Sequence, residues 1–375
     1  MSEDKFLPYG LHHIDDDDIA AVVEVLKGSW ITTGPKVEEF EKSLCDYVGA
    51  KHAVAVNSGT SALDIAVDAL DTPPGSEIIT TPFTFVASSN CILYNQCKPV
   101  FADIEPDTYN ISPQEVEKKI TGKTKAIIYV DYAGQPCRIK ELKEIAEKND
   151  LLLIEDAAHA IGAEYKGKRV GSFADITEFS FHPVKHMTTG EGGACTTESD
   201  ELLDRMQKLR NHGMDRSVKE RFGPNAGYAY DIQMLGRNYR ITDFQCALGL
   251  SQLKKVDRFI ARRQEIAKRY GEEFAKMDDV AVPFVSPDVR HAWHLYPLLV
   301  PERDRFFAEM RKRGIGVNVH YVPAYKFSYY QSLGIGGHFP VTEDISSREI
   351  SLPIFPDMTE DDITRVVNAV REILG

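Results

Sequence analysis

No uninterrupted apolar run in this chain reaches the length of about 20 residues that a membrane-spanning helix needs. Residues 1–5 also lack the basic and then apolar order of a secretory leader. We therefore expect a protein that works in the cytoplasm and has no membrane partner.

Cysteine and positive charge are both scarce. The 375 residues include 6 cysteines, and their spacing fits neither a metal site nor a redox pair. The formal net charge of -13 argues against nucleic acids and anionic membranes, because both bind clustered Lys and Arg. We expect small-molecule partners, no nucleic acid and no bound metal.

The length of 375 residues exceeds what a single hydrophobic core usually holds. Hydrophobic residues make up 43% of the chain, so there is enough apolar material for two cores. We predict a large domain over residues 1–250, which includes an N-terminal arm, and a small domain over residues 251–375.

Short apolar segments alternate with helical patterns through the first half of the chain. Strands are expected at 53–56, 77–80, 99–102, 126–130 and 151–154. Helices are expected at 62–70, 84–94, 113–120 and 139–149, after two N-terminal helices that end at Gly28 and Val48. This alternation is typical of a mainly parallel α/β sheet, whose ligands bind at the carboxyl ends of the strands. No GxGxxG follows these strands, which argues against a dinucleotide-dependent oxidoreductase.

The pattern changes after residue 200. A helix is expected at 201–210, an exposed polar loop at 211–230, and a long helix at 242–270 with Arg262 and Arg263 on a solvated face. Strands at 293–300 and 316–321 and helices at 303–313 and 361–374 follow. These elements predict a smaller C-terminal α+β domain that the long helix joins to the first domain.

A single lysine, Lys185, lies in the stretch Ser180–Gly193, which is rich in hydroxyl and glycine residues. Strands are expected on either side, at 175–181 and 192–197. At the floor of a pocket such a lysine would lose its charge more easily, because desolvation disfavours the ammonium ion, and the free amine could form a Schiff base. The alternative is a solvated lysine in a surface loop.

Two further features lie at predicted strand ends. One strand runs into Ser58–Ser61 at the start of a helix, where backbone N–H groups and the helix dipole attract an anion. The alternative is an ordinary turn whose hydroxyl groups cap the helix. Asp156 ends another strand, where a carboxylate needs a cation or a protonated ring nitrogen beside it, unless it simply caps a helix.

In chain order, the anion-binding turn is followed by Phe85, Asp156, Ser180 and Lys185. Pyridoxal 5′-phosphate (PLP) needs these parts: donors for its phosphate, a flat side chain on its ring, an acid at its pyridinium nitrogen and a lysine for its aldehyde. Each part is weak evidence by itself. All of them, in this order on an α/β chain, predict a PLP-dependent enzyme.

The chain also resembles the DegT/StrS family of nucleotide-sugar aminotransferases, which have the aspartate aminotransferase fold (fold type I). The resemblance covers nearly the whole length, through Asn57–Thr60, Thr80–Pro82, Glu155–His159, the Lys185 stretch and Asn238–Arg240. Within the family it points to the UDP-4-amino-4,6-dideoxy-N-acetyl-β-L-altrosamine transaminases of pseudaminic-acid synthesis. The stretches that carry this finer resemblance are Val130–Gly134, Phe179–His182, Leu248–Lys255 and Val319–Tyr321.

The resemblance implies a role for each matching residue. Lys185 would hold the cofactor and then move the proton, Asp156 would pair with the pyridinium nitrogen, and Phe85 would stack on the ring. His159 would lie near the phenolic oxygen of the cofactor. The phosphate would be held by Gly59, Thr60, Ser180 and, from the neighbouring subunit of a homodimer, Asn238. The sugar would lie near Thr32, Gly34, His320 and Tyr321, for which ordinary loop polarity and strand-edge positions are the alternatives.

The resemblance also implies a reaction. PLP would accept the amino group of L-glutamate as pyridoxamine phosphate (PMP) and pass it to the C4 ketone of a UDP-linked 4-keto-6-deoxy-N-acetyl hexosamine. One branch of the family has histidine in place of the lysine and is a dehydratase, whereas Lys185 favours a transaminase. The alternatives are a GDP-perosamine-type or dTDP-3-/4-keto sugar substrate, or a non-catalytic sugar- or cofactor-binding regulator, against which the Lys185–Asp156 pair argues.

Overall fold

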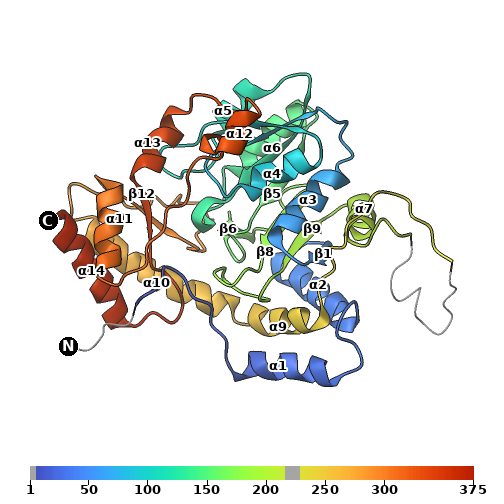
Figure 1. Cartoon of the computed structure of the whole chain (residues 1–375), viewed down its shortest axis with the longest axis horizontal. Coiled ribbons are helices and arrows are strands. Elements are labelled where there is room, and N and C mark those ends of the chain that lie inside the picture. The colour runs from blue at the N-terminus through green and yellow to red at the C-terminus, as the bar shows by residue number, and fades with distance from the viewer. Residues whose placement is uncertain (1–5, 216–228) are drawn as a thin grey trace.

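A seven-stranded sheet forms the centre of the computed structural model, which describes residues 6–215 and 229–375 (Figure 1). Its strand order is β1-β9-β8-β5-β4-β2-β3. The strands are β1 (His52–Val56), β2 (Glu77–Thr80), β3 (Lys98–Phe101), β4 (Thr124–Val130), β5 (Leu152–Asp156), β8 (Ile176–Ser180) and β9 (Gly193–Thr197). β9 is antiparallel to both of its neighbours, and the other neighbouring pairs are parallel. The predicted mainly parallel α/β sheet is confirmed.

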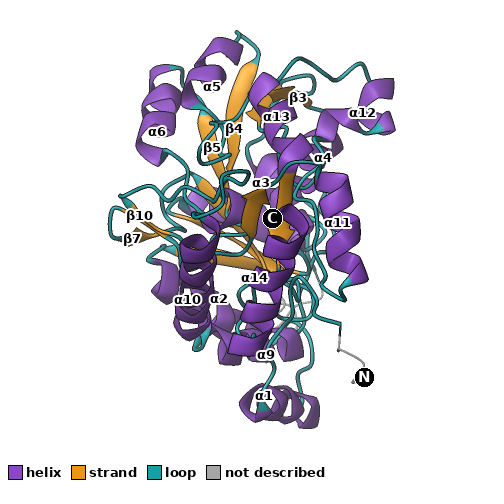
Figure 2. Cartoon of the chain, turned by 90° about the vertical axis from the view of Figure 1, so that its left-hand side faces the viewer, coloured by secondary structure: helices purple, strands orange, loops and turns teal. Residues whose placement is uncertain are grey.

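Helices cover both faces of this sheet (Figure 2). They are α2 (Pro35–Val48), α3 (Gly59–Ala69), α4 (Ala87–Tyr94), α5 (Pro113–Lys119), α6 (Ile139–Lys148) and α7 (Asp200–Arg210). Val54, Ile154 and Ile176 belong to one hydrophobic cluster, whereas Ile127 and Leu153 belong to another. Burial on both faces explains why the strands are almost continuously apolar in the sequence.

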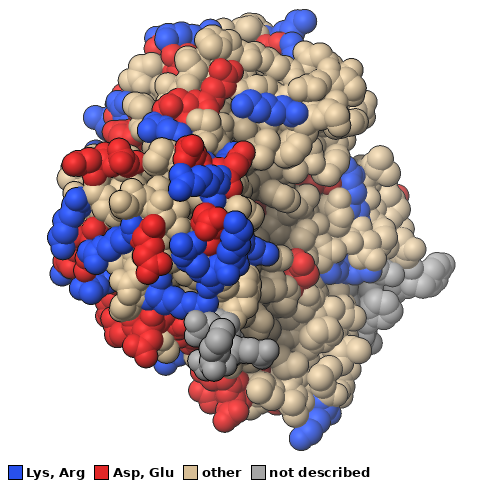
Figure 3. Space-filling model, turned by 60° about the vertical axis from the view of Figure 1, so that its left-hand side comes forward, with Lys and Arg blue, Asp and Glu red and all other residues tan. Residues whose placement is uncertain are grey.

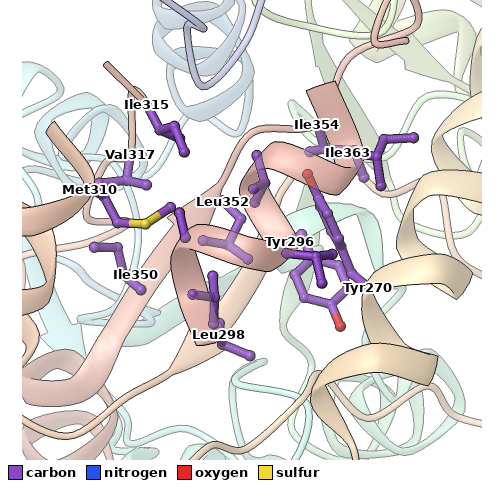
Figure 4. Packing of buried hydrophobic residues seen from close by; sticks show 14 of the residues in the cluster. Tyr270, Tyr296, Leu298, Met310, Ile315, Val317, Ile350, Leu352, Ile354 and Ile363 are labelled. Atoms are coloured by element: carbon purple, nitrogen blue, oxygen red, sulfur yellow. The ribbon is translucent and has the colours of Figure 1, made fainter. Parts of the chain in front are cut away.

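The C-terminal part has its own hydrophobic cluster around the two-stranded sheet of β11 (Tyr296–Leu299) and β12 (Glu349–Leu352) (Figure 4). Its helices are α10 (Val256–Phe274), α11 (Arg303–Lys312), α12 (Ser328–Ser332), α13 (Pro340–Arg348) and α14 (Glu360–Leu374). A third, small sheet joins β6 (Glu164–Tyr165) and β7 (Lys168–Arg169) of the first part of the chain to β10 (Val289–Arg290) of the C-terminal part. Leu7 of the N-terminal arm also joins the C-terminal cluster. The domain boundary at residue 250 stays a prediction.

Three local predictions were wrong. The expected helix 242–270 is two helices, α9 (Asp243–Leu253) and α10. Lys255 lies at the break and forms ion pairs with Asp15 and Asp18 near the start of α1 (Asp16–Lys27). Arg263 is buried and not solvated, because backbone carbonyl groups accept its hydrogen bonds. The expected strand 316–321 is irregular and makes one bridge, between Asn318 and Ser351.

Most of the expected polar loop, residues 216–228, lies outside the described residues. No helix in the described part of the chain is long and apolar enough to span a membrane. On the face shown in Figure 3, basic and acidic side chains are interspersed and do not form separate areas of one sign.

Candidate active site

A cavity of about 660 Å³ opens at the carboxyl ends of β4, β5 and β8. The start of α3, the turn before α4 and the segment 318–322 form its other walls. Because parallel strands end at the same edge of a sheet, residues far apart in the sequence meet here. The predicted site residues that line the cavity are Gly59, Thr60, Phe85, Asp156, His159, Ser180, Lys185, His320 and Tyr321.

Lys185 lies in the connection between β8 and β9. This connection is fixed by its own hydrogen bonds, since Thr189 N and Thr188 Oγ1 both donate to Phe181 O, at 3.1 Å and 3.0 Å. Burial lowers the pKa of Lys185 to about 8, although the nearby acidic residues Asp156 and Glu178 oppose this shift. About one Lys185 side chain in ten is therefore an uncharged amine at pH 7, and the uncharged amine is the nucleophilic form.

Asp156 is the last residue of β5, and two donors fix its carboxylate. Ser88 Oγ donates to Oδ2 at 2.7 Å, and Ala158 N donates to Oδ1 at 3.2 Å. Ser88 comes from α4, so the helix that follows Phe85 also orients the acid. The side chain is buried, which makes its interaction with a cationic ring strong.

The turn between β1 and α3 meets the cavity at Gly59. Ser58 is the N-cap of α3, and its Oγ accepts a hydrogen bond from Ser61 N at 3.1 Å. A Cβ atom at Gly59 would lie 2.6 Å from Glu178 Oε1 and 2.8 Å from Ser180 Cβ, so only glycine fits this close approach. The first turn of α3 therefore brings backbone N–H groups and a positive dipole end to the cavity wall, as an anion site requires.

His159, His320 and Tyr321 form another part of the cavity wall. The Tyr321 hydroxyl and His159 Nε2 are 3.1 Å apart, and their rings are nearly parallel at 16°. Burial lowers the pKa of His159 well below its usual value, with a further contribution from Lys185, so its imidazole is neutral. The His320 ring is oriented by a hydrogen bond, because its Nδ1 lies 2.9 Å from Ser351 Oγ.

Phe85 lies in the turn before α4, and its side chain is 57% exposed at the cavity. Its ring centroid is 6.3 Å from that of Tyr321. An exposed aromatic face beside a buried carboxylate and a buried lysine suits a flat, charged ring. Together with the anion-binding turn, these groups fit PLP.

Three predicted residues do not line the cavity within one chain. Thr32 bridges Thr242, and Gly34 N donates to Asp243 Oδ2 at 2.6 Å, so this loop lies on the start of α9. Asn238 bridges Asn211, and the next residue bonds back to the end of β1, since Asn57 N donates to Tyr239 O.

Other residues in and around the cavity were not predicted: Tyr9, Ser88, Glu178 and His294 line it directly. Of these, Glu178 carried a signal, because it alternates with Ser180 along β8 and so points to the same side of the sheet. Tyr9 lies in irregular chain without a periodic pattern.

The chain matches the DegT/DnrJ/EryC1/StrS aminotransferase family over residues 12–371. It belongs to this family. The predicted family, and with it a transaminase rather than a dehydratase, is confirmed.

Curated relatives and solved structures agree. Spore coat polysaccharide biosynthesis protein SpsC of Bacillus subtilis is 41% identical, with 100% of this chain and 98% of the relative covered. PseC of Helicobacter pylori, an aminotransferase of pseudoaminic acid biosynthesis, is 34% identical with a TM-score of 0.92, and 99% of each chain is covered. Spr1654 of Streptococcus pneumoniae, whose PMP form is 31% identical with a TM-score of 0.93 over 98% of each chain, has also been solved with PLP.

This member of the family is therefore a PLP-dependent sugar aminotransferase with the PseC-like fold. The predicted cofactor is confirmed by the PLP and PMP forms of similar structures.

Proposed function

We propose that this aminotransferase moves the amino group of L-glutamate to the C4 ketone of a UDP-linked 4-keto-6-deoxy-N-acetyl hexosamine, giving a UDP-4-amino-4,6-dideoxy sugar. The observation that carries the proposal is the similarity to PseC, an enzyme of pseudoaminic acid biosynthesis, over 99% of the chain. The cavity keeps the stretch Val319–Tyr321, on which the resemblance to this subfamily partly rests.

Bound PLP would supply an electron sink that accepts the charge released when a proton leaves the substrate carbon. Lys185 would hold the cofactor and move this proton between the substrate carbon and C4′ of the cofactor. Its pKa of about 8 suits both tasks, because an amine that titrates near working pH can both accept and return a proton.

The other residues bind and orient. Asp156, held by Ser88 and Ala158 N, would pair with the protonated ring nitrogen. Gly59, Thr60 and Ser180, which line one cavity with Phe85, would hold the phosphate, and Phe85 would cover one face of the ring. His159 is neutral and lies beside the Tyr321 hydroxyl. It could therefore form a hydrogen bond with the phenolic oxygen of the cofactor without adding a positive charge.

A homodimer completes the proposal. Figures 1 and 2 place α1 at the edge of the molecule, against α9, and its outer face carries Ile19 and Leu26, which are 54% and 56% exposed. Trp30 and Ile31 of the next loop are also exposed. Among the described residues, Lys185 is the only Lys or Arg that lines the cavity, although the proposed donor and nucleotide are anionic. A second subunit would cover the apolar face and bring further polar groups, Asn238 among them.

The dimer is tested by charging this face. We expect the double variant Ile19→Glu/Leu26→Glu to sediment as a monomer and to lose most of its activity, because burying unpaired carboxylates costs several kcal/mol each. Analytical ultracentrifugation gives the mass. The control is Val285→Glu, which charges an exposed apolar residue elsewhere and should remain dimeric. A double variant that stays dimeric and active would show that subunits do not meet through α1.

The substrate is tested with a panel of keto sugars and amino donors. We expect kcat/KM for the UDP-linked 4-keto-6-deoxy-N-acetyl hexosamine to exceed that for GDP- and dTDP-linked keto sugars by at least about 10-fold. L-Glutamate should bleach the visible absorption of the PLP form faster than L-aspartate does. Preference for a GDP- or dTDP-linked sugar would refute the nucleotide assignment while leaving the transaminase intact.

A further inference from the structure

Glu178 is a buried acid in the cavity wall that the proposed mechanism leaves unused. It lies in the middle of β8, is fully buried, and lines the cavity with Asp156 and Lys185. In the parallel pairing of β5 and β8, Asp156 and Glu178 are register partners. Neighbouring strands lie about 4.8 Å apart, so the two carboxyl groups stand side by side on one face of the sheet.

The two acids have different hydrogen-bond partners. Asp156 accepts from Ser88 Oγ at 2.7 Å and from Ala158 N at 3.2 Å. Within the described part of the chain, no group donates a hydrogen bond to either carboxyl oxygen of Glu178. Two adjacent buried carboxyl groups do not both ionise, and the one with donors keeps the charge. Asp156 is therefore the anion of the pair, and Glu178 is the neutral acid.

The remaining surroundings of Glu178 agree with this assignment. The titratable groups that face it are Asp156 from β5, Lys185 from the β8–β9 connection, Cys195 from β9 and Cys91 from α4. Burial raises the pKa of Glu178 well above its usual value and Asp156 raises it further, whereas Lys185 opposes the shift. The Gly59 turn covers the carboxyl group, since a Cβ there would lie 2.6 Å from Glu178 Oε1.

We infer that Glu178 is a positioning residue that stays protonated and donates a hydrogen bond to the Asp156 carboxylate, holding that carboxylate toward the ring nitrogen of the cofactor. The inference rests on the role proposed for Asp156. Ser88 and Ala158 N hold Asp156 from two directions, and Glu178 holds it from the neighbouring strand. One negative charge then faces the cofactor instead of two. A second carboxylate would compete for the ring proton and would favour the charged form of Lys185.

The first test uses cofactor-free protein and the isosteric variant Glu178→Gln. A carboxyl group that is protonated only in the folded state makes folding take up a proton above its ordinary pKa of about 4.3, so stability falls as the pH rises. The glutamine variant has no such group. We expect its Tm advantage over wild type to grow steadily from about pH 5 to about pH 8. A Tm difference that is constant over this range would mean that Glu178 folds as an ordinary anion, which would overturn the inference.

The second test uses the PLP-loaded protein. Glu178→Gln should leave unchanged the pH at which the visible absorption band changes, because a neutral group replaces a neutral group. A lower midpoint would mean that a negative charge had been removed, which contradicts the inference. Glu178→Met, which has no donor, should lower kcat on the order of 10-fold with little change in KM for glutamate, and Glu178→Gln should restore most of kcat.

Glu155→Gln is the matched control. Glu155 is the buried acid next to Asp156 in β5, but it points to the opposite face of the sheet, where Thr177 Oγ1 donates to it at 2.8 Å. We expect its kcat and absorption midpoint to equal those of wild type. If Asp156→Asn proved harmless, the role of Asp156 would fail, yet the pH dependence of Tm would still report whether Glu178 holds a proton.

Discussion

Replacing Lys185 with alanine is expected to lower transamination by about 10⁴-fold or more, because the variant loses both the nucleophile and the base. The purified variant should also lack the yellow absorption of the PLP-loaded protein. The fold should persist, since the β8–β9 connection is held by bonds from Thr188 and Thr189 to Phe181 O. Turnover, the visible spectrum and Tm measure the three effects separately.

Two companion variants sharpen this prediction. Lys185→Arg keeps a cation in the cavity, so its failure to restore activity would show that the amine itself is required. Lys254→Ala removes an exposed lysine at the break between α9 and α10 and should behave as wild type. Addition of a small primary amine should partly restore the proton transfer in Lys185→Ala. Full turnover by Lys185→Ala without added amine would refute the assignment.

The sequence was sufficient to predict the part of the site that the sheet organises. Apolar runs located the strands, and parallel strands end at one edge, so Asp156 and the Ser180–Lys185 stretch had to meet there. The turn after β1 was predicted as an anion site, and the structure adds that its glycine lies against β8. These predictions depend on local pattern and one general rule of sheet geometry.

Features that depend on distant partners could not be predicted in this way. The 242–270 segment has helical periodicity throughout, yet the structure breaks the helix between Leu253 and Val256, where Lys255 pairs with the distant Asp15 and Asp18. Arg263 is charged in any local reading, yet the carbonyl groups of Trp293, His294 and Ile354 solvate it inside the protein. Sequence periodicity predicts the face of a helix on which a side chain lies, but it does not predict which distant groups will contact that side chain.

The resemblance to the family also predicted roles that depend on a second subunit. Thr32, Gly34 and Asn238 were predicted at the substrate and phosphate, but in one subunit Thr32 and Gly34 contact the start of α9, and Asn238 bridges Asn211. Their roles stay predictions that depend on the homodimer. Conversely, Glu178 was visible in the strand alternation but was not considered, because a second buried acid has no place in the general PLP pattern.

The second large effect is expected for Asp156→Asn. The amide keeps the size of the side chain and still accepts a hydrogen bond from Ser88 Oγ, so the fold should be unchanged. It cannot pair as an anion with a protonated ring nitrogen, and the electron sink is weakened. We expect kcat to fall by about 10²–10⁴-fold while the visible band of the loaded protein persists, because Lys185 is intact.

A graded companion tests whether the charge or its orientation matters. Ser88→Ala removes one of the two donors to the Asp156 carboxylate, a hydrogen bond to a charged group worth about 1.5–3 kcal/mol. Its effect on kcat should therefore be smaller than that of Asp156→Asn, at about 10-fold. Equal losses in both variants would mean that orientation by Ser88 is the whole contribution of Asp156. Wild-type turnover in Asp156→Asn would mean that another acid meets the ring nitrogen, and the neighbouring Glu178 is the residue in the structure placed to do so.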